Sequence, residues 1–145
     1  MTGFIFALIA GATMSVQGVF NTRVSEKIGL LESNLIVQGT AFLIAVIAMF
    51  IFGKGDITRV LDCNKLYLTG GILGFVITIT VMLSISNLSP TIAISVILIS
   101  QLFVAALIDA FGLFGAERVP FTITKYIGII LMIAGVIVFK YKGAA

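Results

Sequence analysis

Long apolar runs fill most of the chain and are separated by short polar breaks. A helix needs about 20 consecutive apolar residues to cross a membrane, and five runs are long enough to do so. The predicted spans are residues 3–22, 33–52, 66–88, 90–113 and 121–139. The pattern therefore predicts an all-α integral membrane protein built as a bundle of five transmembrane helices.

The polar breaks carry signals for where the spans begin. Ser89-Pro90 places a capping hydroxyl before a proline at the first helical position, and Val119-Pro120 marks the start of the fifth helix in the same way. The longest break, FGKGDITRVLDCNK, has room for a short surface helix. Because there is no linker or low-complexity tract, we expect residues 1–145 to form a single transmembrane domain.

Composition supports the membrane class and excludes others. The chain is 60% hydrophobic and 10% charged, whereas a soluble domain is about half apolar and about a quarter charged. The net charge of +3 does not indicate nucleic-acid binding, because the few Lys and Arg residues lie between apolar runs. Basic residues in that position belong to the boundary between membrane and water.

Two residue types restrict the possible chemistry. Cys63 is the only cysteine and there is no histidine, so the chain can form neither an internal disulfide nor a metal site of His and Cys. Without histidine there is also no plausible nucleophile–base pair. We therefore expect no enzymatic activity, no cofactor and no metal.

The positive charges are balanced between the two sides of the membrane. With five crossings, the side of the N-terminus carries five Lys and Arg residues and the other side four. Excess positive charge normally faces the cytoplasm, so this chain has either one weakly specified orientation, set by the first helix, or dual topology. We favour dual topology, or pairing with an oppositely oriented paralogue, because opposed halves build alternating access around a site at mid-membrane. The basic residues on the side of the N-terminus are Lys54, Arg59, Lys65, Arg118 and Lys125. Those on the other side are Arg23, Lys27, Lys140 and Lys142.

Polar side chains recur at a spacing of four inside the first and second spans and at a spacing of eight inside the fourth, which places them on one face of each helix. Such groups are costly in hydrocarbon and usually face a bundle interior or a cavity. Amides also bond neighbouring helices together, and for Asn34, near the start of its span, that interpretation is favoured. The residues expected to line a substrate cavity are Gln17, Asn21, Gln101, Asn34 and Gln38.

Asp109 stands apart because it is a carboxylate about one turn before the end of the fourth span. The negative end of the helix dipole disfavours a carboxylate there. Lys125 lies at a similar depth in the fifth span. The pair can be a structural ion pair, or Asp109 can act in coupling or gating as a proton or cation relay. A third interpretation is that Asp109 accepts backbone N–H bonds beyond the helix.

The first three spans carry no acid at their centres, since Glu26 and Glu32 fall in or beside the first predicted loop. A transporter of cationic drugs usually needs a deep carboxylate to neutralise its substrate. The available amides and hydroxyls favour a neutral, zwitterionic or lipid-linked substrate.

Glycines recur at spacings that let helix backbones approach closely in lipid. The alternative is that glycine is simply common in membrane helices. The pairs with an expected packing role are Gly70 and Gly74, and Gly128 and Gly135, with Gly11 and Gly18 repeating in the first span.

Four stretches appear in an order that resembles the YdcZ-type family of small half-transporters in the drug/metabolite transporter superfamily. They are GATMSVQGVFNTRV, VQGTAFLI, LTGGILGFVIT and SQLFVAALIDAFGLFG, and the resemblance covers nearly the whole chain. It implies an inner-membrane protein of bacteria that acts as an antiparallel pair, either a homodimer or a heterodimer with a paralogue. Gln17, Asn21, Gln101 and Asp109 match recurrent polar positions of that family.

One departure limits the resemblance to the wider superfamily. Its small multidrug exporters carry a glutamate in the first helix, where this chain has Ser15, Val16 and Gln17. That difference argues against proton/drug exchange. The expected function is a small-molecule transporter half that works as an antiparallel dimer by alternating access. The alternatives are a membrane scaffold or regulatory subunit that transports nothing, and half of a flippase for a lipid-linked head group.

Overall fold

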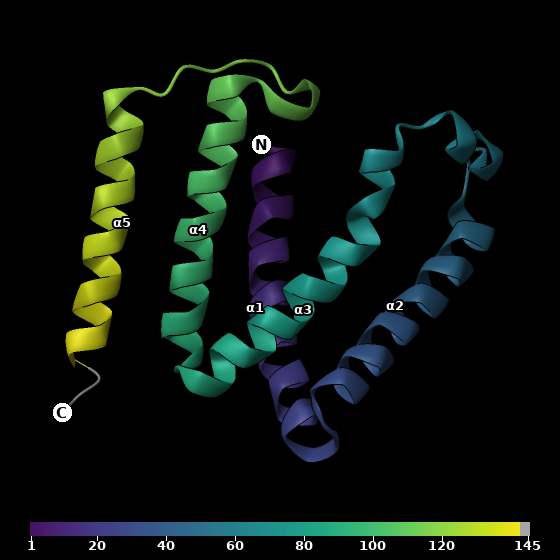
Figure 1. The fold of residues 1–145 in the computed structure, drawn as a ribbon, viewed down its shortest axis with the longest axis horizontal. Helices are drawn as coiled ribbons and strands as arrows, with labels where there is room; N and C mark the ends of the chain where they lie inside the picture. Colours follow the sequence, from purple (N-terminus) through teal and green to yellow (C-terminus); the bar gives the residue numbers. More distant parts are fainter. Residues whose placement is uncertain (143–145) are drawn as a thin grey trace. The chain divides into compact units, whose positions relative to one another are not determined.

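The computed structural model describes residues 1–142 and shows long helices joined by shorter segments (Figure 1). Five helices are long and apolar enough to cross a membrane, which confirms the predicted class. The long helices are α1 (Thr2–Ile28), α2 (Leu30–Phe52), α3 (Gly70–Asn87), α4 (Pro90–Phe111) and α5 (Ile123–Lys142). Three short 3-10 helices are η1 (Ile57–Asp62), η2 (Lys65–Thr69) and η3 (Leu113–Gly115).

The prediction of a loop between the first two spans was wrong, because a single residue, Gly29, separates α1 from α2. Gly29 has a φ of 104°, a conformation that side-chain-bearing residues rarely adopt. Glu26 and Glu32, expected in or beside the loop, lie in α1 and α2. The polar residues at positions 22–27 mark where the chain leaves the apolar layer, and polarity alone does not end a helix.

The long polar break holds η1, as expected from its length, and both η1 and η2 begin at a side-chain cap. Asp56 accepts hydrogen bonds from the hydroxyl of Thr58 at 2.6 Å and from its backbone N–H at 2.9 Å. These two bonds, the hydroxyl first, lower the pKa of the Asp56 carboxyl. Asn64 caps η2 by accepting the N–H of Leu66 at 3.0 Å. The third span therefore starts as a 3-10 turn and becomes α-helical at Gly70.

The contacts divide the chain into two compact units, Met1–Asn87 and Leu88–Ala145. The single domain expected for residues 1–145 stays a prediction, and residues 143–145 lie outside the described residues.

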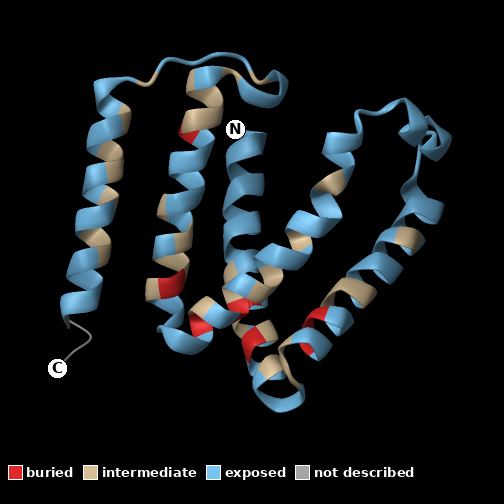
Figure 2. Ribbon diagram, viewed as in Figure 1, coloured by how far each residue is buried: buried red, intermediate tan, exposed pale blue. Residues whose placement is uncertain are grey.

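In the first unit, α1 packs against α2 and α3, and α2 also contacts α3. Figure 2 shows the buried residues in red on all three helices. Most large apolar side chains elsewhere in the unit are exposed, as suits a surface that faces lipid. The buried residues of this unit are Gly18, Thr22, Ser33, Asn34, Met82 and Ile85.

In the second unit, α4 packs against α5. The start of α4 is as predicted: Pro90 is in the first turn and the Ser89 hydroxyl accepts the N–H of Ile92 at 3.4 Å. The predicted start of the fifth helix at Pro120 was wrong, since α5 begins at Ile123. The helical hydrogen bonds begin one residue earlier, where the carbonyl of Thr122 accepts the N–H of Tyr126 at 3.4 Å.

The glycine predictions have a mixed outcome within the described chain. Gly74 of α3 faces α2, because a Cβ there would lie 3.8 Å from Nε2 of Gln38. Gly70, Gly128 and Gly135 have no heavy atom within 4 Å of the same point, so they mediate no helix contact with the described residues of their own unit. For these three, a packing role stays a prediction.

Candidate functional site

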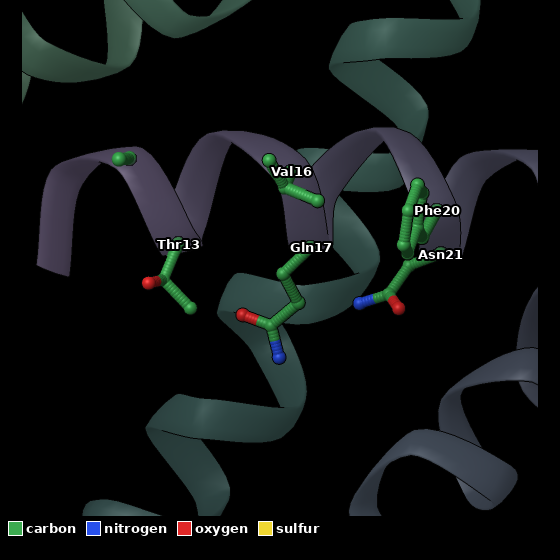
Figure 3. Close-up of a pocket in the computed structure, with 6 residues that line it drawn as sticks. Thr13, Val16, Gln17, Phe20 and Asn21 are labelled. Carbon is green, nitrogen blue, oxygen red and sulfur yellow. The ribbon is translucent and has the colours of Figure 1, made fainter. Parts of the chain in front are cut away.

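A polar stripe follows one side of α1 at the spacing predicted from the sequence. Thr13, Gln17 and Asn21 point to the same side of the helix (Figure 3). They line an open hollow of about 470 Å³ together with Ala12, Val16 and Phe20. Every lining residue belongs to α1, so one helix forms the whole described wall of this hollow.

A second, smaller and more enclosed cavity of about 50 Å³ lies between α1 and α3. Gln17 and Asn21 line this cavity as well, and Thr78 of α3 contributes its hydroxyl side chain. The volume exceeds what one water molecule needs, about 10–15 Å³. The two amides and the Thr78 hydroxyl are therefore the polar groups of a small cavity whose other walls are apolar. The other lining residues are Met14, Gly18, Ile77 and Val81.

Hydrogen bonds connect α2 to this cavity. The amide nitrogen of Gln38 donates to the hydroxyl of Thr78 at 3.5 Å, and that hydroxyl donates to the carbonyl of Gly74 at 2.8 Å. At the other end, the Ser33 hydroxyl donates to the carbonyl of Asn21 at 3.2 Å. The structure thus brings together Gln17, Asn21 and Gln38, three of the five predicted cavity residues, around Thr78.

Asn34, one helical turn before Gln38 on α2, has a relative exposure of 0%. Neither its amide nitrogen nor its amide oxygen has a hydrogen-bond partner in the described chain. The interhelical bond favoured for Asn34 from its sequence position is therefore absent here. Leaving a buried polar group unpaired costs about 1–3 kcal/mol, so Asn34 is a strained polar position in the core of the first unit.

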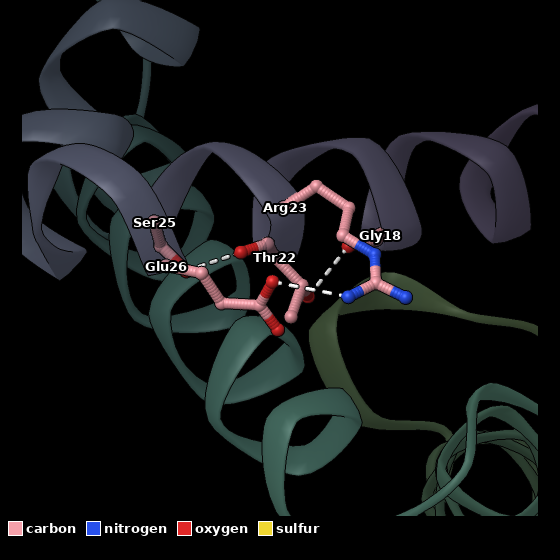
Figure 4. A network of polar contacts seen from close by, with 5 residues as sticks. All are labelled: Gly18, Thr22, Arg23, Ser25 and Glu26. Atoms are coloured by element: carbon pink, nitrogen blue, oxygen red, sulfur yellow. Dashed lines mark hydrogen bonds and ion pairs between the residues drawn. The ribbon is translucent and has the colours of Figure 1, made fainter.

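The charged end of α1 is separate from the two hollows. Arg23 and Glu26 form an ion pair at 3.1 Å, and both side chains are largely exposed (Figure 4). The hydroxyls of Thr22 and Ser25 donate to the carbonyls of Gly18 and Thr22, at 2.8 Å each. No charged residue lines either hollow, so uncharged hydrogen-bonding groups define the polar part of this site.

Asp109 lies in the last turn of α4, next to a tightly closed helix end. Its carbonyl oxygen, rather than its carboxylate, accepts the backbone N–H of Val119 at 2.9 Å. Gly112 ends the helix in the left-handed conformation with a φ of 64°. Arg118 donates from Nε to the carbonyl of Ala110 at 3.1 Å, which places a cation at the negative end of the helix dipole.

The ion pair between Asp109 and Lys125, one of the three interpretations of Asp109, is absent, because the structure of residues 1–142 contains one ion pair, Arg23–Glu26. The loop folds back on α4 and brings Arg118, not Lys125, to the helix end. Asp109 is half-buried and Gln101 is exposed on α4. Both belong to the second unit, so their part in a shared cavity stays a prediction.

The family of the chain follows from comparison with known proteins. A family model described as "Putative inner membrane exporter, YdcZ" matches residues 2–138. The chain belongs to the YdcZ family. Comparisons with curated proteins and with solved structures gave no match. With its five apolar helices, this YdcZ-family chain is an integral protein of the bacterial inner membrane, in a family of exporters rather than enzymes.

Thr78 and Ser33 are the site residues that the sequence did not indicate in this YdcZ-family chain. Hydroxyls in membrane helices commonly bond to their own backbone, and Thr78 has the same local pattern as Thr80, which donates to the carbonyl of Val76 at 2.9 Å. Only the packing of α3 against α1 and α2 distinguishes the two threonines. Within residues 1–142, no three acids or cysteines gather to hold a metal ion.

Proposed function

We propose that this chain is one half of a small-molecule exporter, working as an antiparallel dimer by alternating access, for a neutral, zwitterionic or lipid-linked substrate. The observation that carries the proposal is the hollow on α1, whose described wall is one helix carrying two amides. A transport cavity must be enclosed on all sides, so other helices must complete the wall, and we assign that role to a second, opposed chain. The exporter description of the family supports export as the direction.

The charge distribution supports an opposed second chain. Five Lys and Arg residues on one side and four on the other give neither orientation a clear advantage. Two opposed copies would bring the same amides, Gln17 and Asn21, to the cavity from both sides of the bilayer. Such a pair has the symmetry on which inverted-repeat transporters rely for alternating access.

In this mechanism the amides hold the substrate while the two halves rock around it. Gln17 and Asn21 have no side-chain partner in residues 1–142, so their donors and acceptors are available. Asp109, in the last turn of α4, would couple or gate the movement. Like the two amides, its carboxylate has no partner within residues 1–142. The absence of charge around the two hollows favours substrates without a net charge.

Cross-linking tests the arrangement. Gly3 lies five helical turns before Asn21 on the same side of α1, and the two residues lie at similar distances from the middle of the apolar span 3–22. In a Cys63→Ser background, α1 helices that face each other in an antiparallel dimer link Gly3→Cys chains to Asn21→Cys chains. Parallel pairing instead links Gly3→Cys chains to one another, which would contradict the proposal.

Flux measurements test the activity itself. Purified protein in proteoliposomes is expected to release preloaded uncharged or zwitterionic solutes faster than protein-free vesicles. A chain that moves no solute or lipid, and that co-purifies with a fixed partner, would instead be a scaffold or regulatory subunit.

A further inference from the structure

The two hollows beside α1 differ in character and share two residues. The open hollow of about 470 Å³ lies along the surface of α1, and the cavity of about 50 Å³ lies behind it against α3. Gln17 and Asn21 line both of them. The two amides therefore border both the open hollow and the inner cavity.

The inner cavity offers hydrogen bonds but no charge. The hydroxyl of Thr78 donates its hydrogen to the carbonyl of Gly74 at 2.8 Å, so toward the cavity its oxygen can only accept a hydrogen bond. The amides of Gln17 and Asn21 supply both donors and acceptors. A charged group would lose its hydration there without gaining an opposite charge. The cavity is therefore suited to a small uncharged group such as a hydroxyl or a carboxamide.

The open hollow offers mainly hydrocarbon contact. Ala12, Val16 and Phe20 follow one another at a spacing of four, so they form an apolar stripe beside the polar stripe of Thr13, Gln17 and Asn21. Phe20 has a relative exposure of 65% and Val16 of 52%. An alkyl chain can lie along this stripe while a polar group attached to it reaches the amides.

We propose that the cargo of this site is an uncharged amphiphile, with an alkyl chain along Ala12, Val16 and Phe20 and a hydroxyl-bearing head group at Gln17, Asn21 and Thr78. This inference rests on the proposed transport function and narrows its substrate class. It excludes charged head groups and fully water-soluble solutes as the preferred cargo.

A single tryptophan reports on binding directly, because the natural chain contains none. Phe20→Trp places the fluorophore in the hollow, and Phe50→Trp on α2, where the side chain is 79% exposed, serves as the control for bulk lipid contact. Both variants are placed in phosphatidylcholine nanodiscs and titrated with an alkanol, an alkyl sulfate and an alkyl trimethylammonium. The three probes share one brominated chain, which quenches tryptophan on contact.

The alkanol is expected to quench Phe20→Trp at concentrations about tenfold lower than either charged probe, a difference of about 1.4 kcal/mol. Phe50→Trp should show no head-group preference. Adding Gln17→Leu and Asn21→Leu to Phe20→Trp should abolish the preference. Equal quenching by all three probes would mean bulk acyl-chain contact only and would overturn the inference, as would a preference for a charged head group.

The head-group test can fail while the proposed transport function holds, and the reverse is also possible. If opposed cross-linking and solute flux are observed but the head-group preference is absent, the transporter proposal stands and the amphiphilic cargo is wrong. If the preference is present but cross-linking and flux are both absent, the chain binds amphiphiles without transporting them, and the cargo assignment falls with the transporter proposal.

Discussion

Gly18 of α1 and Ile85 of α3 approach so closely that a Cβ on Gly18 would lie 2.9 Å from Cδ1 of Ile85. The same atom would lie 3.1 Å from Cγ1 of Val81. Since Gly18 also borders the inner cavity, this contact sets how near α3, and with it the Thr78 hydroxyl, can come to the amides of α1. The absence of a side chain at position 18 thus favours both the site and the close packing of α1 against α3.

Gly18→Val is expected to lower the free energy of unfolding by about 1–3 kcal/mol, because the added methyl groups overpack the contact with α3. Gly11→Val is the matched control, since Gly11 lies on the same helix with no heavy atom within 4 Å of its Cβ position. Thermal unfolding in bicelles measures both. Equal effects at the two positions would mean that α1 and α3 do not pack as described.

Thr78→Val is expected to reduce transport about fivefold, because it removes both an oxygen of the inner cavity and the acceptor for Gln38. Thr80→Val provides the comparison: the Thr80 hydroxyl also bonds its own helix, to the carbonyl of Val76, but does not line the cavity. Initial rates of flux from proteoliposomes measure the difference. A similar loss in both variants would assign the effect to α3 as a whole.

Asn34→Leu is expected to raise the unfolding temperature and to lower transport. The substitution removes a buried amide without partners, whose burial costs about 1–3 kcal/mol, and keeps the branching at Cγ. Asn87→Leu is the control, because Asn87 is exposed and its amide already donates to the carbonyl of Leu83 at 2.7 Å. A lower unfolding temperature for Asn34→Leu would mean that the Asn34 amide is paired in the membrane, for example by water.

Asp109→Asn is expected to reduce transport while the dimer remains assembled. The carbonyl of Asp109, which accepts the N–H of Val119, is unchanged by the substitution, so the closed end of α4 should persist. Asp62→Asn, in the exposed segment after α2, should leave transport unaltered. Flux and cross-linking are measured on the same preparations, and undiminished flux in Asp109→Asn would remove this carboxylate from the mechanism.

Cys63 tests orientation without further engineering, because it is the only cysteine and is exposed. In intact cells, a membrane-impermeant thiol reagent is expected to label roughly half of the Cys63 that reacts after permeabilisation, as the balanced charges predict. Labelling of all or none of it would fix one orientation. The opposed half would then have to come from a paralogue, or the antiparallel arrangement would be wrong.

Local sequence patterns were sufficient to predict the five membrane-spanning helices and the polar stripe of α1. The length and apolar character of each run are properties of consecutive residues, and the helical repeat alone places Thr13, Gln17 and Asn21 on one face. The Ser89-Pro90 signal at the start of α4 is local in the same sense.

Tertiary structure decided everything that depends on one helix meeting another. The sequence could not show that Gly18 contacts a neighbouring helix while Gly70 faces open space. Nor could it show that Thr78 joins the amides, because Thr80 has the same local pattern. These differences arise from the rotation and depth of α3 against α1, which no linear spacing encodes. By itself the sequence determined a five-helix membrane protein with amides along its first helix, and the packing of α1, α2 and α3 alone turned two of those amides into the wall of a cavity.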